Sequence, residues 1–174
     1  VNGWDTKSWD NPKRQSSCSC RCSKDLTMET FRLKTFDERI KTMGDIAEQK
    51  FEEHAAVQFV RYGLNRPKIN MAHLPPEIRH TPDYLTTQGL VEVQGLGKDQ
   101  ILKVKHEKLA ALQWWSKVHP LYLFIYDSYR ERTYMMPFKE LNKKCIMSET
   151  NYFPEGKPYY AMPSSLIWAD NERK

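Results

Sequence analysis

The sequence lacks several features that would place it in a specialised class of protein. It has no apolar run near the roughly 20 residues that span a bilayer, nothing at its start that looks like a signal peptide, and no internal repeat. Its four cysteines are too few for the disulfide framework of a small secreted domain. We therefore expect a soluble, cytoplasmic protein without a membrane partner.

The composition is that of a globular domain with an excess of basic residues. The chain has 174 residues, of which 40% are hydrophobic, and this is enough for one substantial core. Its 27 Lys and Arg outnumber its 22 Asp and Glu, which leaves a net charge of +5. Such an excess suits a polyanionic partner, although many soluble proteins share it.

Residues 1–34 differ from the rest of the chain and predict an extended, basic N-terminal arm. They hold seven basic and four acidic side chains, a net charge of +3, and no sustained hydrophobic period. The arm either lies along phosphates or is a solvated tail. Its Cys18, Cys20 and Cys22 are spaced more closely than structural zinc sites favour, so free thiols and a metal site both remain possible.

Two β-prone runs, 80–85 and 90–95, flank a polar connection that ends in Gly89 and predict a β-hairpin. A four-residue connection pairs Leu85 with Leu90, which sets Asp83 opposite Glu92. Because side chains alternate along a strand, Glu92 and Gln94 share one face, while Val91 and Val93 point to the other. We expect one acidic face and one core face.

Directly opposed carboxylates lie roughly 5 Å apart and repel each other unless a cation or a shared proton lies between them. A hard divalent cation such as Mg²⁺ or Mn²⁺ would relieve the repulsion between Asp83 and Glu92. The alternative is a solvated polar face with no ligand.

The stretch Thr-Pro-Asp-Tyr-Leu-Thr-Thr-Gln-Gly-Leu-Val-Glu-Val-Gln-Gly, residues 81–95, resembles the core motif of the PD-(D/E)XK nuclease superfamily. It is especially similar to the phage endonuclease I type of Holliday junction resolvase. The pattern of predicted elements is similar over 36–127, but the close motif covers only 81–95. Gln94 departs from the family, which usually has Lys there; some restriction enzymes of the superfamily also carry Gln.

The resemblance implies an α/β fold with a restriction-endonuclease-like core over 35–148, in which helices flank a mixed central β-sheet in the order αβββαβ, and a C-terminal extension over 149–174. It implies a Mg²⁺- or Mn²⁺-dependent DNA endonuclease that cuts duplex or branched DNA in a bacterial or phage-infected cell, as a junction-resolving enzyme and possible homodimer. Two alternatives are a DNA-binding protein whose hydrolysis Gln94 has silenced, and a sequence-specific restriction endonuclease.

The resemblance also implies which residues form the site. The metal ligands would be Asp83, Glu92, the backbone carbonyl of Val93, and a glutamate of the first helix. Glu48 is the best candidate for that glutamate because it borders the apolar stripe of the helix; its rivals are Glu38, Glu52 and Glu53. Gln94 can accept a hydrogen bond from the attacking water but cannot supply the positive charge of Lys.

Two helices are predicted around the hairpin. Apolar residues at three- and four-residue steps predict the first over 36–56, and a second pattern predicts the other over Asp99–Ser116. Basic charge at a helix start opposes the helix dipole, so a lysine cluster there suggests a nearby phosphate. In some members of the superfamily a lysine of this helix replaces the motif lysine. The candidates here are Lys103, Lys105 and Lys108. The alternative is that these lysines form a solvated face.

The remaining segments complete the expected order of elements. Residues 57–62 are a first strand or a continuation of the helix, 63–79 a loop, 120–127 a buried central strand, 133–136 an edge strand, and 137–141 a short helix. Residues 149–174 are a loop with a possible strand at 159–162, and their aromatic residues either pack on the core or stack with nucleic acid. Candidate DNA contacts are Arg66, Lys68, Arg79, His80 and Lys98.

Overall fold

The computed structural model describes residues 36–64 and 71–169, so the predicted arm, its three cysteines, Arg66 and Lys68 lie outside the described residues. The described chain begins with α2 (Phe36–His54), close to the predicted 36–56. β1 (Phe59–Arg61) follows, which decides between the two predictions for 57–62 in favour of a strand. The predicted loop 63–79 is partly helical, with η1 (Met71–His73) and α3 (Pro76–Arg79).

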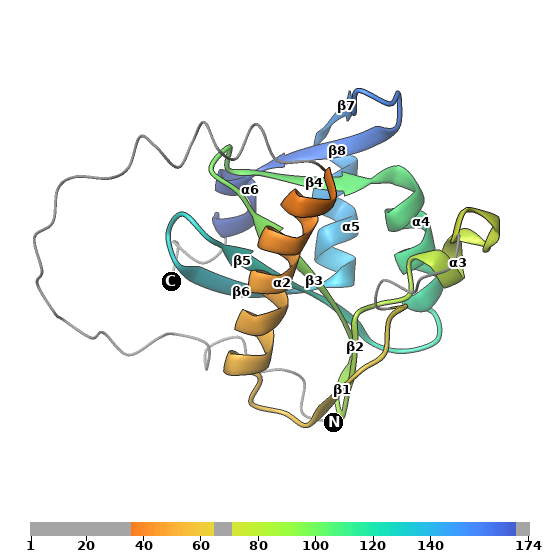
Figure 1. The fold of residues 1–174 in the computed structure, drawn as a ribbon, viewed down its shortest axis with the longest axis vertical. Helices are drawn as coiled ribbons and strands as arrows, with labels where there is room; N and C mark the ends of the chain where they lie inside the picture. The colour runs from red at the N-terminus through yellow and green to blue at the C-terminus, as the bar shows by residue number, and fades with distance from the viewer. Residues whose placement is uncertain (1–35, 65–70, 170–174) are drawn as a thin grey trace, which may run out of the picture.

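A five-stranded mixed sheet is the centre of the fold (Figure 1). Its strands, in spatial order, are β1, β2 (Tyr84–Thr86), β3 (Gly89–Leu96), β5 (Leu121–Asp127) and β6 (Arg132–Pro137). β3 and β5 are parallel and the other neighbours are antiparallel. The predicted mixed central sheet is therefore confirmed, and the predicted apolar run 120–127 forms the well-buried strand β5.

The β2–β3 hairpin has the predicted register, with Leu85 opposite Leu90. The turn is tight because Gly89 adopts a φ of 147° and lies against the carbonyl of Pro120, where a Cβ atom would collide. β2 begins at Tyr84, which pairs with Val91, whereas β3 continues beyond Val91 to Leu96. The second half of β3 therefore has no β2 neighbour on that side.

Helices cover both faces of the main sheet, as predicted. α2 crosses one face (Figure 1) and buries Ala47 and Phe51 against Tyr84, Val91 and Phe124. Burying a side chain as large as Phe51 contributes about 1.5–3 kcal/mol. On the other face, a larger core joins the sheet to α4 (His106–Trp115), α5 (Phe138–Ile146) and α6 (Ser164–Trp168). No helix within the described ranges is long and apolar enough to cross a membrane.

The prediction of a helix from Asp99 is wrong in its first half. Residues Ile101–Lys105 form β4, and α4 begins only at His106. Leu102 and Val104 are buried while Lys103 and Lys105 point the other way, which is the period-two pattern of a strand. The lysines at 98, 103 and 105 therefore do not lie within a helix, and the helix-dipole argument applies only to Lys108.

The possible strand at 159–162 is confirmed as part of β8, but the expectation of a loop over the rest of 149–174 is wrong for most of its described part. Residues Glu149–Tyr152 form β7, Pro158–Pro163 form β8, and α6 follows. β8 lies between β4 and β7 in a three-stranded antiparallel sheet. Its Met162, with Ile167 and Trp168 of α6, is buried in the same core as β5.

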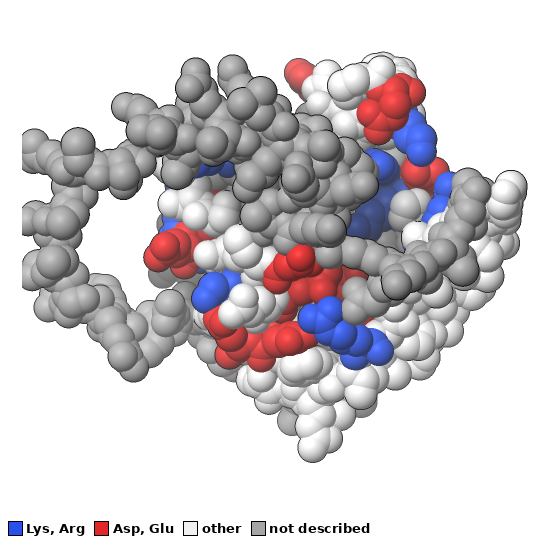
Figure 2. Space-filling model, in the orientation of Figure 1, with Lys and Arg blue, Asp and Glu red and all other residues white. Residues whose placement is uncertain are grey.

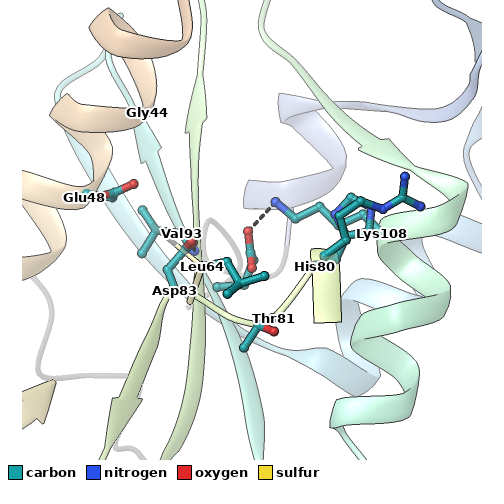
Figure 3. Close-up of a pocket in the computed structure, with 10 residues that line it drawn as sticks. Gly44, Glu48, Leu64, His80, Thr81, Asp83, Val93 and Lys108 are labelled. Carbon is teal, nitrogen blue, oxygen red and sulfur yellow. Dashed lines mark hydrogen bonds and ion pairs between the residues drawn. The ribbon is translucent and has the colours of Figure 1, made fainter. Parts of the chain in front are cut away.

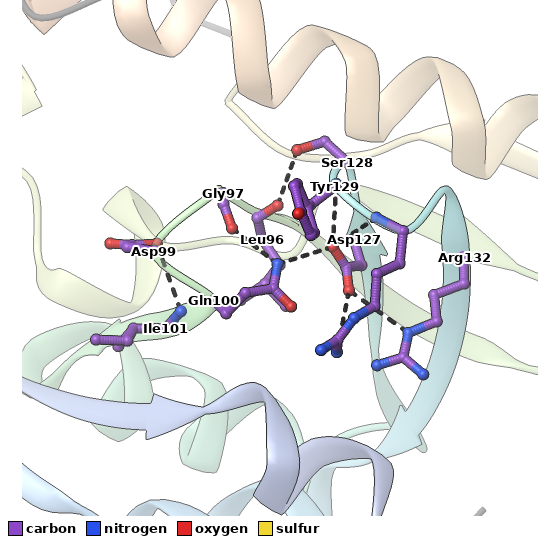
Figure 4. Close-up of polar contacts among 10 residues, drawn as sticks. Leu96, Gly97, Asp99, Gln100, Ile101, Asp127, Ser128, Tyr129 and Arg132 are labelled. Atoms are coloured by element: carbon purple, nitrogen blue, oxygen red, sulfur yellow. Dashed lines mark hydrogen bonds and ion pairs between the residues drawn. The ribbon is translucent and has the colours of Figure 1, made fainter. Parts of the chain in front are cut away.

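Asp127, at the end of β5, joins two turns of the fold (Figure 4). Its carboxylate is fully buried and accepts hydrogen bonds from the Gln100 side chain at 3.0 Å and from the Tyr129 and Arg130 backbone N–H groups at 3.1 and 3.2 Å. Arg132 Nε lies 3.5 Å from its second oxygen. The β3–β4 turn is thereby held against the β5–β6 turn.

Candidate functional site

The site lies where β2 separates from β3. The Asp83 carbonyl accepts hydrogen bonds from the backbone N–H groups of Tyr62 and Gly63, at 2.8 and 3.2 Å, which holds the chain just before β2. The Asp83 side chain turns toward β3 and accepts a hydrogen bond from the Val93 N–H at 2.7 Å. Asp83 is thus fixed beside the half of β3 that β2 does not pair with, next to Glu92.

A cavity of about 240 Å³ opens at this point, between α2, the start of β2, β3 and α4. Figure 3 shows Glu48 reaching in from α2 on one side, Asp83 in the middle, and Lys108 from α4 on the other side. The cavity therefore gathers three predicted acids and one predicted lysine. Its lining consists of Gly44, Glu48, Leu64, Arg79, His80, Thr81, Asp83, Glu92, Val93 and Lys108.

The buried Glu92 and the half-buried Lys108 lie in direct contact, and they form an ion pair when Glu92 is ionised. Glu92 is only 3% exposed, so the alternative of a solvated polar face is wrong for this residue: Leu90 and Leu96 on the same face of β3 are buried under α4 and its neighbours. Burial, and then the repulsion of Asp83, raise the pKa of Glu92 to about 8 against the attraction of Lys108.

The Lys108 ammonium stays charged at neutral pH. Burial alone would lower its pKa, but the carboxylates of Glu92 and Asp83 more than offset this effect, and the net direction is upward. The cavity therefore holds two neighbouring carboxyl groups, those of Asp83 and Glu92, and the ammonium group of Lys108, which reaches from α4 toward β3. A second cation would stabilise the ionised form of Glu92 further, because it would balance the Asp83 charge as well.

Glu48 borders the cavity, as expected for the acid of the first helix, and its side chain is 16% exposed. It accepts a hydrogen bond from Arg61 of β1 at 2.9 Å. Arg61 also pairs with Glu52, which accepts a hydrogen bond from the Tyr84 hydroxyl at 2.8 Å. Of the rivals, Glu52 and Glu53 do not line the cavity, and the side chain of residue 38 lies outside the description.

Arg79 and His80, two predicted DNA contacts, line the cavity on the α4 side. Arg79 donates to Glu107 at 3.2 Å, and His80 Nε2 lies 3.6 Å from the same carboxylate. Burial, and then the charge of Lys108, lower the pKa of His80 to about 4, so the imidazole is neutral at pH 7. A neutral imidazole next to the acids can accept or donate a hydrogen bond to a bound group.

Four predicted residues do not line the cavity. Gln94 donates from Nε2 to the Lys103 carbonyl at 2.8 Å and so joins β3 to β4. Lys103 pairs with Asp99 at 2.7 Å, and the Lys105 ammonium lies 5.3 Å from the centroid of the Phe153 ring. Lys98 is exposed in the β3–β4 turn. Of the three candidate lysines, only Lys108 contacts the acids.

The donors present fit a hard cation that keeps part of its water shell. No group of three or more His, Cys, Asp or Glu side chains is arranged to hold a metal ion within 36–64 and 71–169. Mg²⁺ commonly binds to one or two carboxylates and completes its shell with water and phosphate oxygens. Asp83, Glu92 and the Val93 carbonyl suit that mode, and Glu48 lies on the same cavity.

The sequence did not predict the ion-pair partners of two residues that line the cavity, Glu48 and Arg79. Arg61 lies 13 residues from Glu48, and Glu107 lies 28 residues from Arg79. Neither pair has a local spacing that predicts contact, so no motif could have revealed them.

Comparisons with models of protein families, with curated proteins and with solved structures find no match for this chain.

Proposed function

We propose that this protein is a Mg²⁺- or Mn²⁺-dependent DNA endonuclease with a restriction-endonuclease-like core. The proposal is supported by one observation above all: Asp83, Glu92, Lys108 and Glu48, from four separate parts of the chain, line a single cavity beside β3. The order of α2, three strands, α4 and β5, with β4 and short helices inserted, also fits the predicted αβββαβ pattern. A net charge of +5 suits a DNA partner.

In this proposal Asp83, Glu92 and the Val93 carbonyl hold the metal ion, with Glu48 completing the set. A bound Mg²⁺ or Mn²⁺ would act as a Lewis acid: it would polarise the phosphate and lower the pKa of a bound water. Lys108 takes the role of the missing motif lysine: its ammonium pairs with Glu92 and neutralises charge that develops on the phosphate. The chain keeps Lys108 charged because the two acids raise its pKa.

Gln94 is a structural residue in this proposal. Its amide donates to the β4 backbone, 2.8 Å from the Lys103 carbonyl, and it does not line the cavity. The same observation favours a second candidate, a DNA-binding protein of nuclease type that no longer cuts. The two candidates differ in whether Lys108 replaces the absent lysine in function.

A cleavage assay separates the candidates. Linear duplex, nicked duplex and four-way junction DNA are incubated with the protein and Mg²⁺ or Mn²⁺. Asp83→Asn and Lys108→Met should each lower the cleavage rate at least about 100-fold, because each removes a charge that acts on the metal or the phosphate. Asp99→Asn, which changes an exposed acid outside the cavity, is the matched control and should keep the activity.

DNA binding without any metal-dependent cutting would overturn the proposal in favour of the binding protein. Discrete, sequence-dependent fragments from plasmid DNA would instead indicate a restriction endonuclease. Preferred cutting of the four-way junction would support a junction-resolving role, and sedimentation of the protein with and without the junction would show whether it acts as a homodimer.

A further inference from the structure

The small sheet β4–β8–β7 has one buried face and one face turned to solvent. Leu102, Val104 and Met162 point into the core. Cross-strand partners share a face, so Lys105, which lies opposite Tyr159, points away from that core together with Tyr159. Asn151 of β7 lies opposite Tyr159 on the other side and continues the same row.

Phe153, just after β7, belongs to this solvent-facing surface. Its ring centroid lies 4.3 Å from that of Tyr159, and the Lys105 ammonium lies 5.3 Å from the Phe153 centroid. Lys103, two residues before Lys105, points to the same side, and all four side chains are partly exposed. We call this surface the Lys105 face; it consists of Lys103, Lys105, Asn151, Phe153 and Tyr159.

The Lys105 face combines positive charge with aromatic rings. Asp99 pairs with Lys103, and Glu149 lies at the far edge of the same face, but Lys105 has no ion pair with an acid within the described ranges. Lysines beside partly exposed rings are the combination that holds unpaired nucleotides, since the ammonium groups bind phosphates and the rings stack on bases. An acidic peptide would use the charge but not the rings.

The Lys105 face is continuous with the cavity. Lys105 directly precedes α4, and Lys108 in the first turn of α4 lines the cavity. Figure 2 shows Lys and Arg atoms gathered between β4 and the start of α4, apart from the acidic atoms over α2.

We propose that the Lys105 face binds a single-stranded segment of DNA; in the proposed nuclease this binding would direct cutting to DNA with unpaired nucleotides, such as branched or frayed ends. This inference rests on the proposed nuclease function for its choice of DNA as the ligand. The binding it describes does not require cleavage, so the two can be tested apart.

The test is fluorescence anisotropy of the purified full chain in EDTA, with labelled oligothymidylate of about 16 nucleotides and a labelled duplex of equal length. Lys105→Ala and Phe153→Leu should each weaken oligothymidylate binding at least about fivefold, because one removes a phosphate contact and the other a stacking ring. Phe153→Leu keeps an apolar side chain, and circular dichroism verifies that each variant is folded.

Two variants serve as controls. Tyr152→Ala removes an exposed ring from the neighbouring position, whose side chain points to the opposite side of β7, and Lys139→Ala removes an exposed lysine of α5. Both should change the affinity less than about twofold. If all four variants weaken binding equally, or none does, or a poly-glutamate peptide competes as well as the oligonucleotide, the inference is overturned. Single-strand binding without cleavage would keep the inference and contradict only the proposed nuclease.

Discussion

Replacing Lys108 by Met tests the contact with Glu92 directly, because the substitution keeps most of the length of the side chain and removes its charge. In the protein, the Lys108 ammonium limits the rise in the pKa of Glu92, which burial and Asp83 bring from 4.5 to about 8. Without the ammonium this pKa rises further. The folded variant therefore holds the Glu92 proton to a higher pH than the folded wild type does.

The stability lost in this variant should grow with pH. At pH 6 Glu92 is protonated in both folded proteins, and the variant loses only a hydrogen bond to a neutral carboxyl, worth about 1 kcal/mol. Above pH 8 the wild type releases the proton and the variant keeps it, so the difference increases by about 1.4 kcal/mol for each pH unit. We expect a loss of about 3 kcal/mol at pH 9.5, within the range for breaking a buried ion pair.

The same coupling between proton binding and folding predicts how the stability of the wild type changes with pH. The unfolded chain releases the Glu92 proton near pH 4.5 and the folded chain near pH 8, so the folded state binds more protons between these values. The stability contributed by protonated Glu92 is complete below pH 4.5 and is lost as the pH rises toward 8, by at most about 5 kcal/mol. Glu92→Gln should remove this pH dependence.

Urea denaturation followed by tryptophan fluorescence, at pH 6 and pH 9.5 with a chelator, measures these differences. Lys103→Met is the control, since Lys103 forms an exposed ion pair with Asp99 that should contribute less than about 1 kcal/mol at either pH. An equal loss at both pH values in Lys108→Met would refute the coupling between Lys108 and the ionisation of Glu92.

Three further substitutions test the frame around the cavity, each by the free energy of unfolding in urea. Asp127→Ala should cost about 3 kcal/mol, because it leaves buried donors without an acceptor, whereas the exposed Asp99→Ala should cost less than about 1 kcal/mol. Gly89→Ala should cost about 2 kcal/mol or more, since its φ of 147° disfavours a side chain and the new Cβ would collide with the Pro120 carbonyl; a neutral result would mean that this turn relaxes. Leu123→Ala should cost about 3–5 kcal/mol through a cavity in the sheet core, and a loss below about 1 kcal/mol would contradict the packing described.

Features encoded over short distances were predictable. The polar connection before Leu90 set the hairpin register, because the length of a turn determines which residues pair. The apolar run of β5 predicted a buried strand, since a strand covered on both faces of the sheet has little polar surface. The first helix was also predicted from its apolar period, and its inward-facing Ala47 and Phe51 are fully buried.

Features that depend on distant segments were not predictable in this way. Residues 101–105 alternate like a strand, but they adjoin a helical pattern, and only pairing with β8, more than 50 residues later, makes them β4. Apart from the possible strand at 159–162, the C-terminal segment looked like a loop because its prolines and aromatic residues have no clear period. Its strands form because β4 offers an edge with free hydrogen-bonding groups.

The sequence by itself determined that Asp83 and Glu92 would lie close together on one hairpin, because strand register and alternation are local properties of the chain. It also determined the mixed α/β class through its hydrophobic periods. Only the tertiary structure decided which of the three lysines meets these acids. Lys103 and Lys105 lie on a strand that faces away, whereas α4 packs on the sheet and brings Lys108 to Glu92. The partner of a buried charge is set by long-range packing, which no local pattern encodes.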